Sequence, residues 1–148
     1  MIETDIALRP ATTADAGRIA ALFTDEGYPV GGSAIEARLG QFGSDDSTVI
    51  VADHHGEILG FIALHVVPRF EHDESIVRIV ALVVDSSVRG RGIGGALMAE
   101  AERFGQAHDS AFVEVTAGHH RPGARHLYES LGYDASLTAY LRKRLPGR

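Results

Sequence analysis

The chain has 148 residues, of which 45% are hydrophobic and 23% charged, and its formal net charge is −6. The acidic balance argues against a general nucleic-acid binder, because phosphate neutralisation needs clustered lysine and arginine. A sequence without cysteine excludes disulfides and thiolate metal sites. A chain of this length builds a single core, so we expect residues 1–148 to form one domain.

The opening residues MIETDIALRP carry acids and lack the apolar centre of a secretory signal. No stretch reaches the roughly 20 apolar residues of a membrane span. We therefore expect a soluble, cytoplasmic protein with no membrane partner.

The N-terminal third predicts one strand and two helices. Apolar and polar residues alternate over 6–8, as in a short strand, and apolar residues recur at helical spacing over 16–23. Ser33 and Glu36 have the spacing of a capping box, which predicts a second helix that continues to Phe42.

The middle of the chain predicts consecutive strands. The segments 48–53, 57–67 and 74–85 are apolar and rich in β-branched residues, and turn residues separate them. Strands joined so closely pair in antiparallel fashion. From Gly92 the apolar spacing becomes helical again, with a stripe through Leu97.

The C-terminal part predicts a strand, a helix and a final strand. Residues 111–116 form the first strand, Pro122 can open the helix, and Gly132 can close it. The last strand is expected over 136–145. The predicted order is β-α-α-β-β-β-α-β-α-β, an α/β fold whose mixed, mainly antiparallel central sheet is flanked by helices.

The segment VVDSSVRGRGIGGAL, residues 83–97, contains a glycine-rich turn between a strand and a helix. Gly90, Gly92 and Gly95 match G-x-G-x-x-G, but several residues separate them from the strand and no second half-site follows, which argues against a dinucleotide site. A P-loop is excluded because the sequence's lysine, Lys143, lies far from this turn. Amides at a helix start favour an anion such as pyrophosphate; the alternative is a purely structural turn.

These residues also carry a resemblance to a known family. Residues 89–94, RGRGIG, resemble the R-x-x-G-x-G acetyl-CoA motif of GNAT-superfamily N-acetyltransferases. ARHLYESLGY, residues 124–133, is similar to that family's A-x-x-L-Y-x-x-L-G-[FY] motif, and 7–16 resemble its usual N-terminus. The resemblance implies one N-acetyltransferase domain over 1–148, with strands splayed before and after the glycine-turn helix.

The resemblance further implies a direct transfer of acetyl from acetyl-CoA to a primary amine, on a small molecule or a peptide. By this resemblance, the backbone of Leu82, Val83 and Val84 would hold the pantetheine arm and polarise the thioester. The turn would hold the pyrophosphate through Arg89, Gly90, Arg91, Gly92, Ile93, Gly94 and Gly95.

Proton transfer is assigned to two residues. Tyr128 matches the family's tyrosine that protonates the departing thiolate, and the alternative is a packing role beside its apolar neighbours. The family's basic glutamate has no match, because Val80 stands there. Glu114, two residues before Thr116, is a candidate base through a water, or else a solvent-facing glutamate. Arg121 replaces the family's CoA-contacting asparagine.

Other chemistries have less support. The spacing of His119, His120 and His126 lacks the i, i+4 pattern of a helical zinc site, so we expect no metal. His119 or His120 could instead relay the amine proton. His54 and His55 fit a solvated hairpin turn. A serine hydrolase is disfavoured because no G-x-S-x-G elbow is present.

The acceptor is expected near two acid-rich segments that contain Glu26 and Glu71, whose field would attract a cationic amine. Tyr28 could supply an aromatic wall. An alternative from another class is a non-catalytic acyl-CoA sensor, which the missing glutamate and asparagine fit and which Tyr128 argues against. Sheet edges near the C-terminus often pair between subunits in this family, so a homodimer is a further expectation.

Overall fold

The computed structural model describes residues 5–117 and 122–148, and the chain divides into two compact units. The first unit ends at Val115 and contains all strands of the described residues. Its elements are β1 (Ile6–Pro10), η1 (Thr13–Asp15), α1 (Ala16–Asp25), α2 (Gly32–Gln41), β2 (Ser47–His54), β3 (Glu57–Val67), β4 (Ile76–Val84), η2 (Ser86–Val88), α3 (Ile93–Ala107) and β5 (Val113–Val115). The second unit, Thr116–Arg148, contains α4 (Pro122–Ser130).

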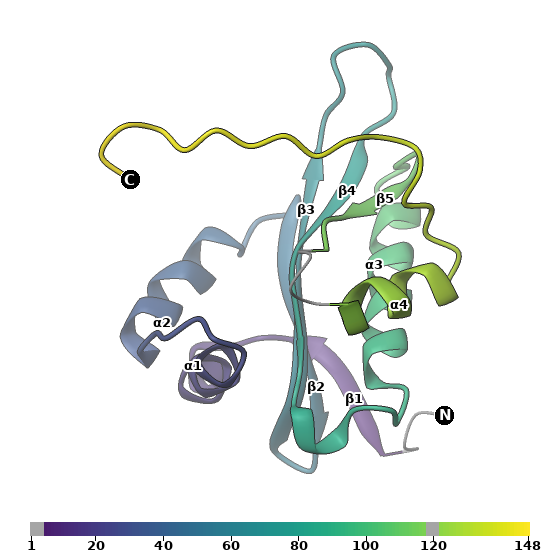
Figure 1. The fold of residues 1–148 in the computed structure, drawn as a ribbon. Helices are drawn as coiled ribbons and strands as arrows, with labels where there is room; N and C mark the ends of the chain where they lie inside the picture. Colours follow the sequence, from purple (N-terminus) through teal and green to yellow (C-terminus); the bar gives the residue numbers. More distant parts are fainter. Residues whose placement is uncertain (1–4, 118–121) are drawn as a thin grey trace. The chain divides into compact units, whose positions relative to one another are not determined.

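The first unit contains a five-stranded sheet, whose strands lie in the order β1-β2-β3-β4-β5. Neighbours are antiparallel from β1 to β4, and β5 runs parallel to β4 after the crossover through α3. Helices α1 and α2 cover one face of the sheet and α3 covers the other (Figure 1). The predicted α/β class and mainly antiparallel sheet are therefore confirmed. Among the described residues, no helix has both the length and the hydropathy that crossing a membrane requires.

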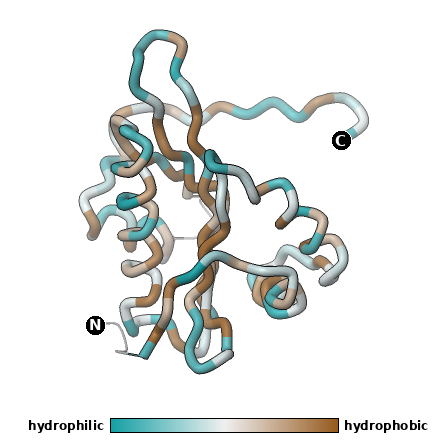
Figure 2. Tube along the Cα trace, turned by 180° about the vertical axis from the view of Figure 1, so that it is seen from behind, coloured by the Kyte–Doolittle hydropathy of each residue, from teal (hydrophilic) through white to brown (hydrophobic). Residues whose placement is uncertain are grey.

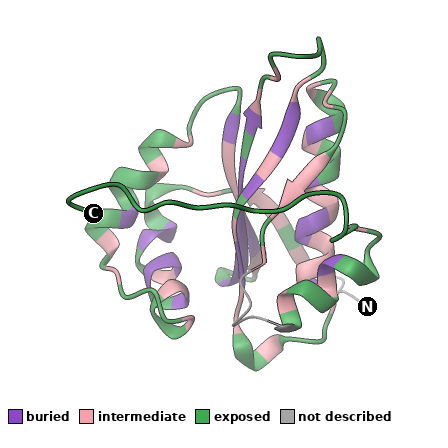
Figure 3. Cartoon of the chain, turned by 45° about the horizontal axis from the view of Figure 1, so that its top comes forward, coloured by how far each residue is buried: buried purple, intermediate pink, exposed green. Residues whose placement is uncertain are grey.

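Strand β3 lies at the centre of the sheet and is buried over most of its length. Phe61 belongs to the core cluster that α1 and α2 form, whereas Ile62, next along the strand, points to the opposite face. A strand that is covered on both faces has a nearly continuous apolar sequence, as residues 57–67 have. Figure 2 shows the hydrophobic residues concentrated along the strands. Figure 3 shows the buried residues on the strands and on the inner sides of α1 and α3.

Strand β4 carries a bulge that separates its two halves. Ala63 is paired with Ala81 and Leu64 with Ile79, so Val80 is the extra residue on β4. On its other side, β4 pairs with β5 only from Val77 to Ile79. Beyond the bulge, β4 and β5 no longer form a ladder, which agrees with the expected splay of these strands.

The start of α2 and the C-terminal strand differ from the prediction. Helix α2 begins at Gly32 with Gly31 as its N-cap, two residues before the predicted Ser33 cap, because the extended Gly31 already starts the helix. The strand expected over 136–145 is wrong, since those residues form no strand. Leu137 and Leu141 are 79% and 89% exposed, and an alternating pattern gives a strand only where a neighbouring strand pairs with it.

Helix α4 ends as the sequence predicts. Gly132 adopts a left-handed φ of 93° just after the helix. The amide of Tyr133 donates to the carbonyl of Tyr128 at 3.0 Å, and that of Gly132 donates to Glu129 at 3.1 Å. This is the Schellman pair of bonds, and it brings the rings of Tyr128 and Tyr133 to 6.3 Å between centroids. The L-G-Y part of the motif therefore fixes the backbone that carries Tyr128.

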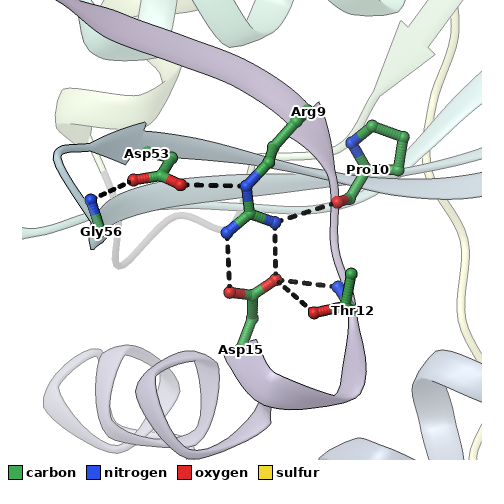
Figure 4. Close-up of polar contacts among 6 residues, drawn as sticks. All are labelled: Arg9, Pro10, Thr12, Asp15, Asp53 and Gly56. Atoms are coloured by element: carbon green, nitrogen blue, oxygen red, sulfur yellow. Dashed lines mark hydrogen bonds and ion pairs between the residues drawn. The ribbon is translucent and has the colours of Figure 1, made fainter.

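Arg9 ties β1 to the start of α1 and to the β2–β3 turn (Figure 4). Its guanidinium donates two hydrogen bonds to the Asp15 carboxylate, at 2.9 and 3.0 Å, and one to Asp53 at 3.0 Å. The amide of Thr12 also donates to Asp15, at 2.8 Å. Asp15 is 7% exposed. The hydrogen bonds from Arg9, more than any other contact, lower the pKa of the Asp15 carboxyl.

Gly60 on β3 allows close approach of β3 and β4. A Cβ at this position would lie 2.8 Å from the carbonyl oxygen of Val83 and 3.3 Å from Cα of Val84. We expect Gly60→Ala to reduce the free energy of unfolding by about 1–3 kcal/mol, because the backbone must shift to relieve the overlap. Urea denaturation measures this change. Gly40→Ala, in an open position on α2, is the matched control and should stabilise by about 0.5–1 kcal/mol; equal effects would contradict the close-approach argument.

The Asp15 carboxylate should make the free energy of unfolding depend on pH. Its pKa is lowered in the folded state, so the carboxylate stabilises the fold at neutral pH and this contribution is lost as the pH falls through the depressed pKa. We expect Asp15→Asn to lose about 1–3 kcal/mol of unfolding free energy at pH 7, because Arg9 loses its anionic partner. Denaturation at pH 7 and pH 3 should show the gap between variant and wild type shrinking in acid. A gap independent of pH would contradict the ionic role.

Candidate functional site

The site begins on β4 beyond Ile79, the last residue of β4 that pairs with β5 in the described part of the chain. The amide of Asp85 donates to the carbonyl of Leu59 at 2.8 Å, which makes this a hydrogen-bonded pair of the antiparallel β3–β4 ladder. Such pairs alternate, so the backbone polar groups of Val83 point to β3, whereas those of Leu82 and Val84 point to the opposite edge. Of the three residues singled out from the sequence, Leu82 and Val84 thus direct their backbone groups away from β3, and Val83 directs its groups toward β3.

Asp85 fixes the turn that leaves β4. Its carboxylate accepts hydrogen bonds from the amide and the hydroxyl of Ser87, both at 2.9 Å, and these bonds lower the pKa of Asp85. Arg18 of α1 donates to the same carboxylate and to the carbonyl of Ile58. Helix α1 therefore helps to hold η2, which leads into the glycine turn.

The glycine turn presents backbone amides. Gly90 and Gly92 both have φ of 84°, a left-handed conformation that other residues adopt at a cost. Gly92 is the N-cap of α3, and the amide of Ala96 donates to its carbonyl at 3.0 Å. The amides of residues 93–95 consequently have no acceptor within the helix. Together with the helix dipole, they form a place where an anion is stabilised.

The first arginine of the motif is ion-paired. Arg89, whose side chain is 55% exposed, pairs with Glu26 at the C-terminal end of α1. The Glu26 side chain is only 11% exposed. Sequence analysis placed Glu26 in the acceptor region, whereas the structure places its carboxylate at the glycine turn. Arg91 is exposed in the same turn.

Glu114 lies on β5 directly opposite Arg78 of β4. Arg78 donates to the Glu114 carboxylate at 2.6 Å, and the two side chains are 31% and 37% exposed. Glu114 is thus held in a cross-strand ion pair, a contact that the sequence analysis did not identify. Arg78 and Glu114 form the last residue pair but one of the β4–β5 ladder.

The remaining expected residues belong to different elements. Tyr28 is 48% exposed and its ring packs edge-on against Phe23, with centroids 6.3 Å apart. Glu71 is exposed in the loop between β3 and β4. Tyr128 lies in α4 of the second unit and is 6% exposed. His119, His120 and Arg121 lie outside the described residues.

A cavity of about 250 Å³ lies between the sheet and the helices α1 and α2. We call it the apolar pocket; its lining residues are Ile19, Phe23, Ile35, Arg38, Leu39, Phe42, Val49, Phe61, Ala63, Val80 and Ala81. Sequence analysis missed the pocket because its walls come from α1, α2, β2, β3 and β4. Val80, at the β4 bulge, brings the lining to the point where the β4–β5 ladder ends.

A second cluster that the sequence analysis missed lies at the β2–β3 turn. His55 and Gly56 both have positive φ, of 52° and 90°, as a two-residue hairpin turn requires. His54 is paired with Ile6, and ligand atoms of Asp5, His54 and His55 lie within 4.8 Å of one another. The hydrogen bond from His55 is the main cause of the lowered pKa of Asp5. These side chains are at least partly exposed.

Comparison with known proteins defines the class. The model of the acetyltransferase (GNAT) family matches residues 15–133. An uncharacterised N-acetyltransferase of Bacillus subtilis, YhfO, is 33% identical over 138 residues, which cover 86% of this chain and 89% of that protein. The aminoalkylphosphonate N-acetyltransferase of Salmonella typhimurium is 33% identical over 86 residues, 58% of this chain and 56% of that protein.

The fold is shared with solved structures. A transcriptional regulator from Bacillus halodurans has a TM-score of 0.87 at 21% sequence identity, and the match covers 95% of this chain and 99% of that one. Identity at this level shows the fold alone. The match to the family model and the Bacillus subtilis relative show more: the chain belongs to the GNAT family of acetyltransferases and is an acyltransferase.

Proposed function

We propose that the protein transfers the acetyl group of acetyl-CoA to a primary amine by direct attack. The observation that carries the proposal is the continuity of two features. The edge of β4 at Val84, beyond the last residue that pairs with β5, runs through the Asp85-capped turn into the amides of residues 93–95. One ligand with a peptide-like arm and a pyrophosphate suits both features, and acetyl-CoA is such a ligand.

In this proposal, each part of the site has one task. Outward-facing backbone groups of Leu82 and Val84, with Val83 between them, pair with the pantetheine arm, and an amide among them donates to the thioester oxygen. The amides from Gly90 to Gly95 hold the pyrophosphate. Arg89 and Arg91 add charge-assisted hydrogen bonds to the phosphates.

The reaction joins the amine nitrogen to the thioester carbonyl carbon and breaks the bond between that carbon and sulfur. Tyr128 donates its phenolic proton to the departing thiolate. Through a water, Glu114 takes a proton from the amine nitrogen and then releases it to solvent, and the tyrosine regains a proton from solvent. The products are the N-acetyl amine and CoA thiol, so atoms and charge balance.

The acceptor in this proposal is an amine on a small molecule. The Salmonella typhimurium relative is named for aminoalkylphosphonates, which are small amines that carry an anionic group. The acidic β3–β4 loop supplies less attraction for a cation than its composition suggests, because Glu74 lies 3.9 Å from Arg69.

Removal of the Glu26 carboxylate should strengthen cofactor binding. In this proposal, Glu26 competes with phosphate for Arg89. We therefore expect Glu26→Gln to lower the Kd of acetyl-CoA at low salt. The expected change is about 2–5-fold, because a single, partly exposed ion pair contributes little free energy. The gain should diminish at 0.5 M salt because of screening. Calorimetric titration measures both. Glu36→Gln, an exposed acid on α2, is the charge-matched control; an equal gain there would show only a change of net charge.

Tyr128→Phe tests the transfer itself. We expect the kcat for CoA-thiol release in the presence of amine to fall roughly 10²-fold or more, because the thiolate then leaves without its proton donor. Acetyl-CoA affinity should stay within a few-fold of wild type. Tyr133→Phe is the control on the neighbouring ring. Undiminished release in Tyr128→Phe would refute the acid role, and binding without amine-dependent release in the wild type would refute the transfer.

Glu114→Gln tests the base. If Glu114 takes the amine proton, the loss in kcat/KM should be roughly 10²-fold near pH 7 and should shrink as the pH approaches the amine pKa of about 10, where the amine is already neutral. Arg78→Gln removes the partner and keeps the carboxylate, so it should retain most activity. A defect in Glu114→Gln that is the same at every pH, and is matched by Arg78→Gln, would assign the pair a structural role.

A further inference from the structure

We propose that the apolar pocket selects an acceptor amine that carries one apolar group and one carboxylate, as apolar α-amino acids do. This inference rests on the proposed transfer and specifies its acceptor. It also reverses the expectation of a cationic acceptor, which came from the acid-rich segments of the sequence.

The pocket walls are almost entirely hydrocarbon. Phe61 and Ala63 form part of the floor and are 1% and 7% exposed, and Phe42 and Val80 stand at more exposed parts of the lining. A volume of about 250 Å³ is below the roughly 300–1,000 Å³ of pockets that hold drug-sized ligands. The space therefore suits a single branched aliphatic or phenyl group rather than a whole cofactor. A polyamine would gain nothing there, because its charges would lose their water.

Arg38 supplies the one charged side chain of the lining. It lies on α2 and is exposed. Over residues 5–117, other arginines such as Arg9, Arg18 and Arg78 pair with carboxylates, whereas no such ion pair involves Arg38. In a chain with 20 acidic residues, a guanidinium without an acid at the edge of an apolar pocket is placed to bind an anionic group of a ligand.

The pocket also adjoins the place assigned to the thioester. Val80 and Ala81 line the pocket, and the backbone groups of Leu82, the next residue along β4, point away from β3. A strand rises about 3.3 Å per residue, so the pocket wall at Val80 lies roughly 7 Å along β4 from Leu82. An α-amino acid spans this distance, with its side chain in the pocket and its amine toward the edge.

The test is CoA-thiol release by the full chain with four matched amines. L-phenylalanine has the apolar group and the carboxylate, phenethylamine lacks the carboxylate, glycine lacks the apolar group, and putrescine is a dication. We expect kcat/KM for L-phenylalanine to exceed that for glycine and putrescine at least 10-fold, the size of discrimination that one apolar group gives. Putrescine equal to or better than L-phenylalanine would overturn the proposal.

Two variants separate the two recognition elements. Arg38→Gln should raise KM for L-phenylalanine about 10-fold and leave phenethylamine unchanged, and Arg38→Lys should restore part of the loss. Ala63→Val, which narrows the floor, should reduce the advantage of L-phenylalanine over glycine about 10-fold. Equal losses for all amines in both variants would overturn the assignment.

Calorimetric binding of N-acetyl-L-phenylalanine, with CoA present, separates this inference from the proposed reaction. Binding that Arg38→Gln weakens supports the pocket even if no amine releases thiol, and in that case only the transfer fails. Thiol release from putrescine, without binding of N-acetyl-L-phenylalanine, overturns the pocket and leaves the transfer intact. If neither occurs, both are overturned.

Discussion

The short parallel pairing of β4 with β5 is the constraint on which the site depends. Only Val77 to Ile79 pair with β5, and the bulge at Val80 follows at once. A longer ladder would use the outward backbone groups of Val84 within the sheet. Because the ladder between the described residues ends at Ile79, β5 does not use the outward groups of Val84, and the same bulge places Val80 in the wall of the apolar pocket.

The second element, the glycine turn, is held from outside its own segment. Two left-handed glycines direct the amides of α3, and Asp85 fixes the preceding turn with help from Arg18 of α1. Helix α1 also provides Glu26 to Arg89 and part of the pocket lining. One helix thus supports the proposed phosphate site and the proposed acceptor site, so its anchoring by Asp15 and Arg9 bears on both.

Local patterns in the sequence were enough for most of the fold. The central strands follow from apolar runs, and Gly92 and Gly132 begin and end helices because their positive φ is set by local geometry. The strand over 136–145 could not be judged in this way, since pairing with a distant partner decides it. Ser33 was mistaken for a cap because the sequence does not show that Gly31 is already extended.

The site was less accessible to sequence reasoning. The glycine turn and the motif around Tyr128 are contiguous and were found. The Arg78–Glu114 pair joins residues 36 apart, and the apolar pocket combines side chains from five elements, so neither has a local signature. Charge composition does not show which charges are paired: Glu26 pairs with Arg89, whereas among the described residues no ion pair involves Arg38.

Amide shifts in uniformly ¹⁵N-labelled protein during a titration with CoA test the central claim most directly. The account predicts saturable shifts that are largest at Val84 and at residues 93–95, with little change along β2. Saturable shifts confined to other segments, with Val84 and the glycine turn unaffected, would contradict it.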